Sequence, residues 1–140
     1  MRRRDVARTL YYLARYKVGM LDIERALIGP MSWIAGRPEA DVLADCAAWY
    51  AQEVRAYLVP AMVATVAAHR RAGHVTAVLT SGTRYLAGPV AADLGIEHLL
   101  VTRVVVRGGR FTGEVERPVC YGHGKIFWAE QFADAHGIDL

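Results

Sequence analysis

Two segments of this sequence carry residue types that suit the binding of an anion. The first is Thr80-Ser81-Gly82, which offers two hydroxyls and a glycine between an apolar, β-branched run and the start of a helical pattern. The carboxyl end of a parallel strand that opens into a helix is a common ligand site in α/β proteins, and the free N–H groups of a helix start favour phosphate. The alternative is that Thr80 or Ser81 only caps the helix, and the turn alone does not separate the two interpretations.

The second segment is Gly122-His123-Gly124-Lys125, a glycine-bracketed loop that delivers a lysine to the start of a helix. The chain has two lysines beside 15 arginines, so the use of lysine here is selective. A compact ammonium group acts as a point charge on a phosphoryl oxygen. We therefore predict that Lys125 contacts phosphate, with a solvated surface lysine as the alternative, and we interpret His123 as a solvated loop residue.

Other catalytic patterns are absent from the sequence. It contains no Walker-type loop, no Gly-x-Ser-x-Gly elbow, no His-Glu-x-x-His helix and no Asp-x-Asp pair. Asp22 and Glu24 form the nearest carboxylate pair, and we interpret them as acids that stabilise a helix start. Cys46 and Cys120 lie far apart without metal-ligand spacing, so we predict buried free thiols and neither a disulfide nor a zinc site.

The helices that would position these residues follow from the spacing of apolar side chains. Helical periodicity covers residues 6–17, 22–27, 39–57, 61–71, 84–94 and 125–136. Gly73 and Gly95 are placed to close two of these helices. The helix over 39–57 is predicted to be amphipathic, with an apolar stripe of Val42, Leu43, Cys46, Trp49, Tyr50 and Val54.

Short apolar runs predict the strands. Residues 74–80 lack polar alternation, as in a parallel strand that is buried on both faces, and residues 98–101 form the next strand. With a helix between them, these strands predict a βαβ unit. Paired glycines separate two further β-rich runs, over 104–106 and 110–115, and predict a small β-hairpin. The predicted fold class is therefore α/β with a partly parallel sheet.

Composition places the chain among globular proteins of one domain. It has 140 residues, of which 54% are hydrophobic and 22% charged, with a net charge of +3. No apolar run approaches the roughly 20 residues of a membrane helix, and the basic residues Arg2 to Arg4 run into Asp5 without the apolar run of a secretory signal. The arginine triplet has no interleaved aromatic residues. We expect a cytoplasmic protein with neither nucleic acid nor membrane as a partner.

Four motifs, taken in order, resemble one protein family. They are the segment from Thr80 to Leu86, Leu94-Gly95-Ile96, the segment from Gly108 to Gly113, and Gly122-x-Gly124-Lys125. Their order and spacing are similar to the phosphoserine-phosphatase-like branch, subfamily IB, of the haloacid dehalogenase (HAD)-like hydrolases. The resemblance covers nearly the whole chain and implies a partial Rossmann-like parallel sheet, with a helical cap region over 1–58 and an incomplete α/β core over 59–140.

The resemblance also implies roles for individual residues. In this family, the hydroxyl residue that ends the second motif strand binds the transferring phosphoryl group, which assigns Thr80, with Ser81 and Gly82 beside it. Lys125 corresponds to the lysine that neutralises the phosphoryl group and the aspartyl-phosphate. The substrates are small phosphomonoesters and the cofactor is Mg²⁺. Substrate selection is expected from cap residues such as Arg15 and Lys17.

Two family motifs have no counterpart in the sequence. One is the Asp-x-Asp pair of the nucleophile and the general acid, and the other is the acidic pair that holds Mg²⁺. We therefore expect a chain that is truncated at both ends, is inactive alone and exposes an unpaired sheet edge. The alternatives are a non-catalytic module that binds a phosphorylated ligand or a protein, and a helical protein that recruits a partner. Substrate identity and oligomeric state are not predicted.

Overall fold

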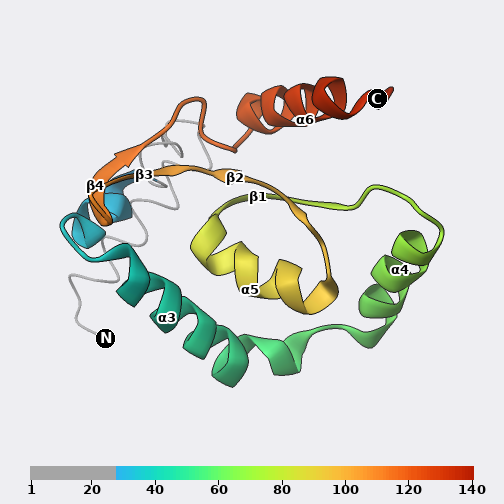
Figure 1. Ribbon diagram of the computed structural model, residues 1–140, viewed down its shortest axis with the longest axis horizontal. Helices are drawn as coiled ribbons and strands as arrows, with labels where there is room; N and C mark the ends of the chain where they lie inside the picture. Colours follow the sequence, from blue (N-terminus) through green and yellow to red (C-terminus); the bar gives the residue numbers. More distant parts are fainter. Residues whose placement is uncertain (1–27) are drawn as a thin grey trace, which may run out of the picture.

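The computed structural model describes residues 28–140 and is shown in Figure 1. Several predictions concern residues 1–27 and therefore lie outside the described residues. They are two helices, the carboxylate pair Asp22 and Glu24, and the cap residues Arg15 and Lys17. The helices in chain order are η1 (Gly29–Ile34), α3 (Glu39–Trp49), η2 (Tyr50–Val54), η3 (Arg55–Tyr57), α4 (Pro60–Arg71), α5 (Arg84–Leu94) and α6 (His123–His136). The strands are β1 (Ala77–Thr83), β2 (His98–Thr102), β3 (Val104–Arg107) and β4 (Arg110–Val115).

The helical segment before residue 58 has the predicted extent but a narrower apolar face. α3 carries Glu39 and Asp41 in its first turn, where acids stabilise the helix dipole, and the chain stays helical through η2 and η3. Val42 and Tyr50 are buried. The stripe prediction is wrong for Leu43 and Trp49, which are 46% exposed, because the packing of α3 against α5 leaves these side chains partly uncovered.

A parallel pair of strands joined by α5 confirms the βαβ prediction. β1 and β2 pair in parallel, with Leu79 opposite Leu100 and, after an irregularity, Thr83 opposite Thr102. α5 has the predicted bounds and ends at Gly95, whose φ of 66° suits glycine. Figure 1 shows α5 on one side of the two strands and α6 on the other.

β1 differs from the prediction in position and burial. It begins at Ala77 rather than at residue 74 and continues to Thr83. The prediction of a strand buried on both faces is wrong, since Leu79 is 42% exposed. Within residues 28–140, β1 pairs only with β2, and a strand with a single neighbour leaves one edge and part of its faces uncovered.

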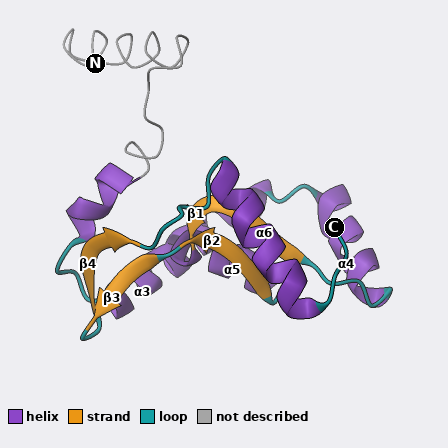
Figure 2. Ribbon diagram, turned by 90° about the horizontal axis from the view of Figure 1, so that it is seen from above, coloured by secondary structure: helices purple, strands orange, loops and turns teal. Residues whose placement is uncertain are grey.

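The predicted hairpin is confirmed and extends toward the helical region. β3 and β4 pair antiparallel, and Gly108 and Gly109 both have positive φ, as a two-residue hairpin turn requires. The segment before α3 pairs with β4, because the Gly36 N–H donates to the Phe111 carbonyl at 2.8 Å and the Phe111 N–H donates to the Arg37 carbonyl at 3.1 Å. Figure 2 places this hairpin and α4 at opposite ends of the molecule.

One apolar cluster links the helical region, α5 and the hairpin. Val42, Tyr85 and Phe111 are its buried members, and the Tyr85 and Phe111 rings meet edge to face with centroids 4.9 Å apart. The cluster is completed by Ile34, Cys46, Val104 and Val106. It contains side chains from both sides of residue 58, and the division into a cap region and a core remains a proposal. In the described part of the chain, no helix has the length and apolar character needed to cross a membrane.

Candidate functional site

The predicted anion-binding turn is an irregular end of β1. Regular pairing with β2 is interrupted between Leu79 and Thr83, so Thr80, Ser81 and Gly82 bulge out of the ladder. The Gly82 N–H donates to Thr80 Oγ1 at 3.2 Å. The Ser81 carbonyl accepts a hydrogen bond from the Thr102 hydroxyl at 2.8 Å. The turn is therefore held in shape by contacts within itself and by β2.

The capping interpretation of this turn is wrong. α5 begins at Arg84, its N-cap residue is Thr83, and no side chain within the described residues caps it. Thr80 instead uses its hydroxyl oxygen to accept from Gly82. The first N–H groups of a helix have no partner inside the helix. The start of α5 thus keeps backbone donors beside the turn, as an anion site requires.

The loop before Lys125 is built around a buried cysteine. Cys120 is fully buried, its N–H donates to Thr102 Oγ1 at 3.3 Å, and its Sγ donates to the Leu100 carbonyl at 3.3 Å. Gly124 is buried where a Cβ would collide with the Val119 carbonyl oxygen. The close approach explains why glycine precedes Lys125, and it fixes the backbone that carries the lysine.

The Cys120 thiol is influenced by both the turn and the lysine. Burial raises the pKa of this thiol, while the positive charge of Lys125 and a hydrogen bond with the Thr80 backbone oppose that rise. Both opposing effects fall off steeply with distance. The printed contacts agree, because Thr102 bonds both Ser81, next to Thr80, and Cys120, five residues before Lys125.

An apolar pocket of about 310 Å³ lies beside the turn. Ser81, Gly82 and Thr83 form part of its wall, whereas Thr80 and Lys125 do not line it. The rest of the wall comes from the helical region, α5 and β2, and consists of Met31, Ile34, Val42, Cys46, Tyr85, Leu86 and Thr102. No charged residue lines this pocket among the residues described.

Two carboxylates, Glu39 and Asp93, join the helical region to α5, and neither of them lines this pocket. Glu39 accepts a hydrogen bond from the Tyr85 hydroxyl at 2.7 Å and pairs with Arg84. The hydrogen bond from Tyr85, followed by that from Arg84, lowers the pKa of Glu39. These contacts hold the start of α3 against the start of α5.

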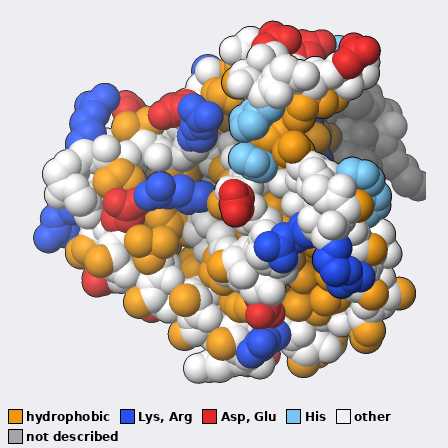
Figure 3. All heavy atoms as spheres, turned by 45° about the vertical axis from the view of Figure 1, so that its right-hand side comes forward, with side chains coloured by type: hydrophobic (Ala, Val, Ile, Leu, Met, Phe, Trp, Pro, Cys, Tyr) orange, Lys and Arg blue, Asp and Glu red, His pale blue; other side chains and the backbone are white. Residues whose placement is uncertain are grey.

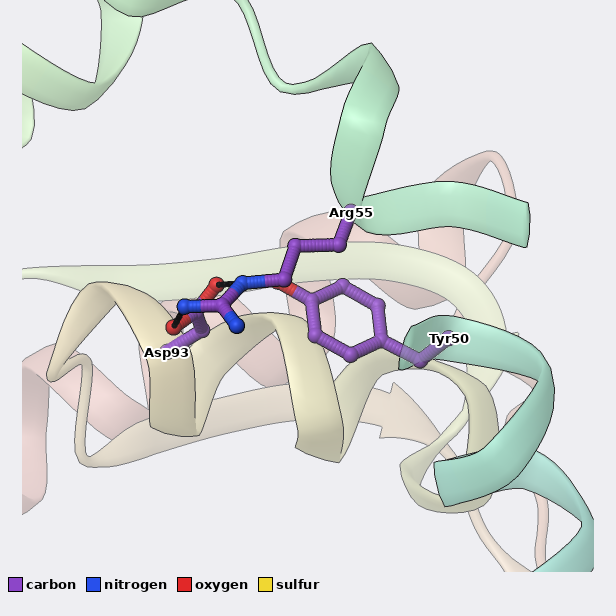
Figure 4. Close-up of polar contacts among 3 residues, drawn as sticks. All are labelled: Tyr50, Arg55 and Asp93. Carbon is purple, nitrogen blue, oxygen red and sulfur yellow. Dashed lines mark hydrogen bonds and ion pairs between the residues drawn. The ribbon is translucent and has the colours of Figure 1, made fainter. Parts of the chain in front are cut away.

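The second carboxylate is Asp93, near the end of α5. Its Oδ2 accepts from the Tyr50 hydroxyl at 2.6 Å and from Arg55 Nε at 3.1 Å, as Figure 4 shows. The Tyr50 hydrogen bond and then the Arg55 charge lower the pKa of Asp93. The helical region is thus joined to both ends of α5.

Sequence reasoning missed Thr102 and Glu39. Thr102 had a usable signal, because it is a polar residue directly after an apolar run at the carboxyl end of a predicted parallel strand. Glu39 had none, since its partners lie 45 and 46 positions away. Among residues 28–140, no group of three or more His, Cys, Asp or Glu side chains is placed to hold a metal ion.

Comparison with known families agrees with this fold. The sequence model of the haloacid dehalogenase-like hydrolase family matches residues 2–140. The chain therefore belongs to the haloacid dehalogenase-like hydrolases, and the predicted family is confirmed.

Two curated relatives carry phosphatase names. A probable phosphatase of Mycobacterium tuberculosis strain H37Rv is 36% identical over 75 residues, which are 54% of this chain and 26% of that protein. The phosphoserine phosphatase of Methanocaldococcus jannaschii is 29% identical over 76 residues, which are 54% of this chain and 36% of that enzyme. The match thus spans well under two thirds of either relative.

Solved structures share the fold. A protein of unknown function from Bordetella pertussis Tohama I superposes with a TM-score of 0.81 and 26% identity, over 96% of this chain and 60% of that one. A phosphoserine phosphatase in a phospho-aspartyl intermediate analogue form superposes with a TM-score of 0.60 and 22% identity, over 96% and 61% of the two chains. The predicted HAD-like α/β fold class is confirmed.

Proposed function

We propose that this chain is the phosphate-binding part of a phosphomonoester hydrolase that acts through an aspartyl-phosphate. The observation that carries the proposal is the Thr102 hydroxyl, which joins the Ser81 carbonyl of the turn to the Cys120 N–H of the loop that leads to Lys125. Family membership and the phosphatase names of two curated relatives support it. A chain with these groups alone can hold a phosphoryl group by hydrogen bonds and charge.

Each predicted site residue has a place in this proposal. The Ser81 hydroxyl and the backbone N–H groups at the start of α5 bind phosphoryl oxygens. Thr80 accepts from Gly82, and because a hydroxyl can donate as well as accept, its proton stays available for the phosphoryl group. Lys125 supplies the positive charge that stabilises the charge developing during transfer.

We assign binding, and not turnover, to these 140 residues alone. The sequence has no Asp-x-Asp pair to supply a nucleophile, and the described residues hold no ligand cluster that would fit Mg²⁺. The chain's own side chains therefore bind and orient the phosphoryl group. A non-catalytic module that binds a phosphorylated ligand is the second candidate, supported by the same two features.

The pocket beside the turn narrows the substrate class. Its wall has hydroxyls at the turn and apolar side chains elsewhere, with no charged residue among those described. A charged amino-acid group would lose its hydration there without gaining an ion pair, which is costly. We therefore propose an ester whose phosphate lies on the turn and whose organic group is apolar.

Calorimetric titration of the purified chain with inorganic phosphate tests the proposal. Binding is expected for the wild type, and Lys125→Ala should weaken it at least about tenfold, because a hydrogen bond to a charged group contributes about 1.5–3 kcal/mol. Arg107→Ala is the matched control, since this arginine is 77% exposed on the hairpin. Equal affinity in the Lys125 variant and the wild type would contradict the proposal.

Turnover by the same preparation separates the enzyme from the binding module. With Mg²⁺ and para-nitrophenyl phosphate, we expect no product from the 140-residue chain. Magnesium-dependent turnover that disappears in Lys125→Ala would overturn the assignment of binding alone. A concentration-dependent oligomer without phosphate affinity would instead favour a helical interaction protein.

A further inference from the structure

Thr102 holds a buried hydroxyl between the two halves of the candidate site. It ends β2, is 6% exposed and is the one buried polar residue among those described. Its hydroxyl donates to the Ser81 carbonyl at 2.8 Å and accepts from the Cys120 N–H at 3.3 Å. One side chain therefore contacts both the phosphate turn and the loop that leads to Lys125.

Both backbone groups need this partner for a structural reason. Ser81 lies where the pairing of β1 with β2 is interrupted, so its carbonyl has left the regular ladder. Cys120 is a buried residue of the loop between β4 and α6. A buried backbone group without a hydrogen bond is costly. The Thr102 hydroxyl uses its donor for one group and an acceptor lone pair for the other, which fits the capacity of a hydroxyl.

We infer that Thr102 is a positioning residue for phosphate binding, because it fixes the turn at Ser81 relative to the loop that carries Lys125. The inference rests on the proposed function and deepens it. Neighbouring contacts act in the same direction, since the Cys120 Sγ donates to the Leu100 carbonyl two residues before Thr102. Without the hydroxyl, the link between the Ser81 carbonyl and the Cys120 N–H is lost, and the geometry for one phosphate ion is relaxed.

Two substitutions separate the hydroxyl from the shape of the side chain. Thr102→Val keeps the branched shape and removes both hydrogen bonds, while Thr102→Ser keeps the hydroxyl and loses a methyl group. Thr65→Val is the matched control, because Thr65 also donates its hydroxyl to a backbone carbonyl, that of Ala61 at 2.9 Å, but on the exposed helix α4. Helix content and unfolding midpoints establish that each variant is folded.

The experiment measures two quantities on the full chain. The first is the affinity for inorganic phosphate, and the second is the amide hydrogen exchange of Cys120 and Gly82. Thr102→Val should weaken phosphate binding about tenfold, because a displaced turn would lose about one hydrogen bond to the charged phosphate. The same variant should speed amide hydrogen exchange at Cys120. Thr102→Ser should stay within about threefold of the wild-type affinity, and Thr65→Val should change neither quantity.

The outcomes that overturn the inference are distinct from those that overturn the proposed function. If Thr102→Val exchanges faster at Cys120 but binds phosphate as the wild type does, the hydroxyl is structural only and the inference fails while the function stands. If Thr102→Ser binds as weakly as Thr102→Val, packing of the methyl group is responsible and the inference also fails. If Thr102→Val does not fold, only Thr102→Ser tests the inference, and a tenfold loss of phosphate affinity in that variant contradicts it. If the wild type itself does not bind phosphate, the proposed function fails first.

Discussion

The two ends of the parallel strand pair differ in where their polar groups lie: they are buried at one end and exposed at the other. At the carboxyl end, Thr102 and Cys120 are buried, and the Thr102 hydroxyl bonds the turn at the Ser81 carbonyl and the loop at the Cys120 N–H. At the amino end, histidine and charged side chains gather on the surface, as Figure 3 shows. His98 contacts the rings of Phe132 and His136 there, each with centroids 4.9 Å apart. Residue types alone would favour the histidine-rich end, but burial and convergent backbone groups favour the other.

The pockets differ in a similar way. The amino-end pocket, of about 260 Å³, is lined by Arg70, His74, Glu97 and His98. At the carboxyl end, the pocket beside the turn has an uncharged wall with hydroxyls at one side, while a second pocket, of about 520 Å³, includes Thr102 and charged residues. Exposed polar residues of mixed charge are largely satisfied by water, whereas a built site holds its polar groups by contacts with the protein. The candidate site is therefore identified by polar groups that the protein holds in place, and not by the number of polar groups.

Substitution of Gly124 should cause the largest loss of stability, at the carboxyl end of the strand pair. Gly124→Ala places a Cβ against the Val119 carbonyl oxygen, and such overpacking costs about 3 kcal/mol. Urea unfolding should show this loss of stability. Gly88→Ala in α5 is the matched control, because a Cβ there meets nothing within 4 Å, so it should be neutral or raise stability by up to about 1 kcal/mol. An unchanged midpoint in Gly124→Ala would show that the loop is not rigid.

The apolar wall of the pocket should set the preference between ligands. Leu86→Gln places a polar group in the wall and should weaken binding of phenylphosphonate about tenfold relative to inorganic phosphate, because several apolar contacts of about 0.8 kcal/mol per methylene are lost. Leu43→Gln is matched in exposure, at 46% against 45% for Leu86, and Leu43 does not line the pocket. Competition calorimetry with both ligands measures the ratio. A ratio that is the same in both variants contradicts the apolar substrate class.

The amino end should be insensitive to phosphate. His98→Ala removes two ring contacts and should lower the free energy of unfolding by about 1 kcal/mol, with no change in phosphate affinity. Denaturant unfolding and phosphate titration of the same sample measure the two effects. A tenfold loss of phosphate affinity in this variant would reverse the assignment of the two ends.

The Tyr50–Asp93 contact should give the smallest effect, and one that depends on pH. The folded pKa of Asp93 is lowered from 3.8, so its contribution to stability is fully present above the unfolded pKa and is lost as the pH falls through the folded pKa. Tyr50→Phe should therefore be less stable than the wild type at pH 7, with a smaller gap below about pH 3 to 4. Tyr57→Phe, at an 83% exposed position, is the control. A gap that widens on acidification would show that Asp93 is not the partner that matters.

Local signals in the sequence were enough to predict most helices and strands and the two segments of the candidate site. Helical spacing and Gly95 gave the bounds of α5, and paired glycines gave the hairpin. Contacts between distant residues were not predictable, because nothing local connects Thr102 to Ser81, 21 positions away, or to Cys120, 18 positions away. The exposure of β1 was missed for the same reason, since the burial of a strand depends on its neighbours and not on its own residues.

α3 is held by hydrogen bonds near both of its ends, and we expect these contacts to limit changes in the width of the pocket. At its start, the backbone beside Gly36 is bonded to β4 and Glu39 holds Tyr85. Past its end, Tyr50 holds Asp93. The wall contributed by the helical region therefore cannot swing outward on a single hinge. We expect the pocket to exclude organic groups that are wider than its opening, because its wall does not adjust to them. Affinity should then fall sharply at one size along a series of esters of increasing bulk.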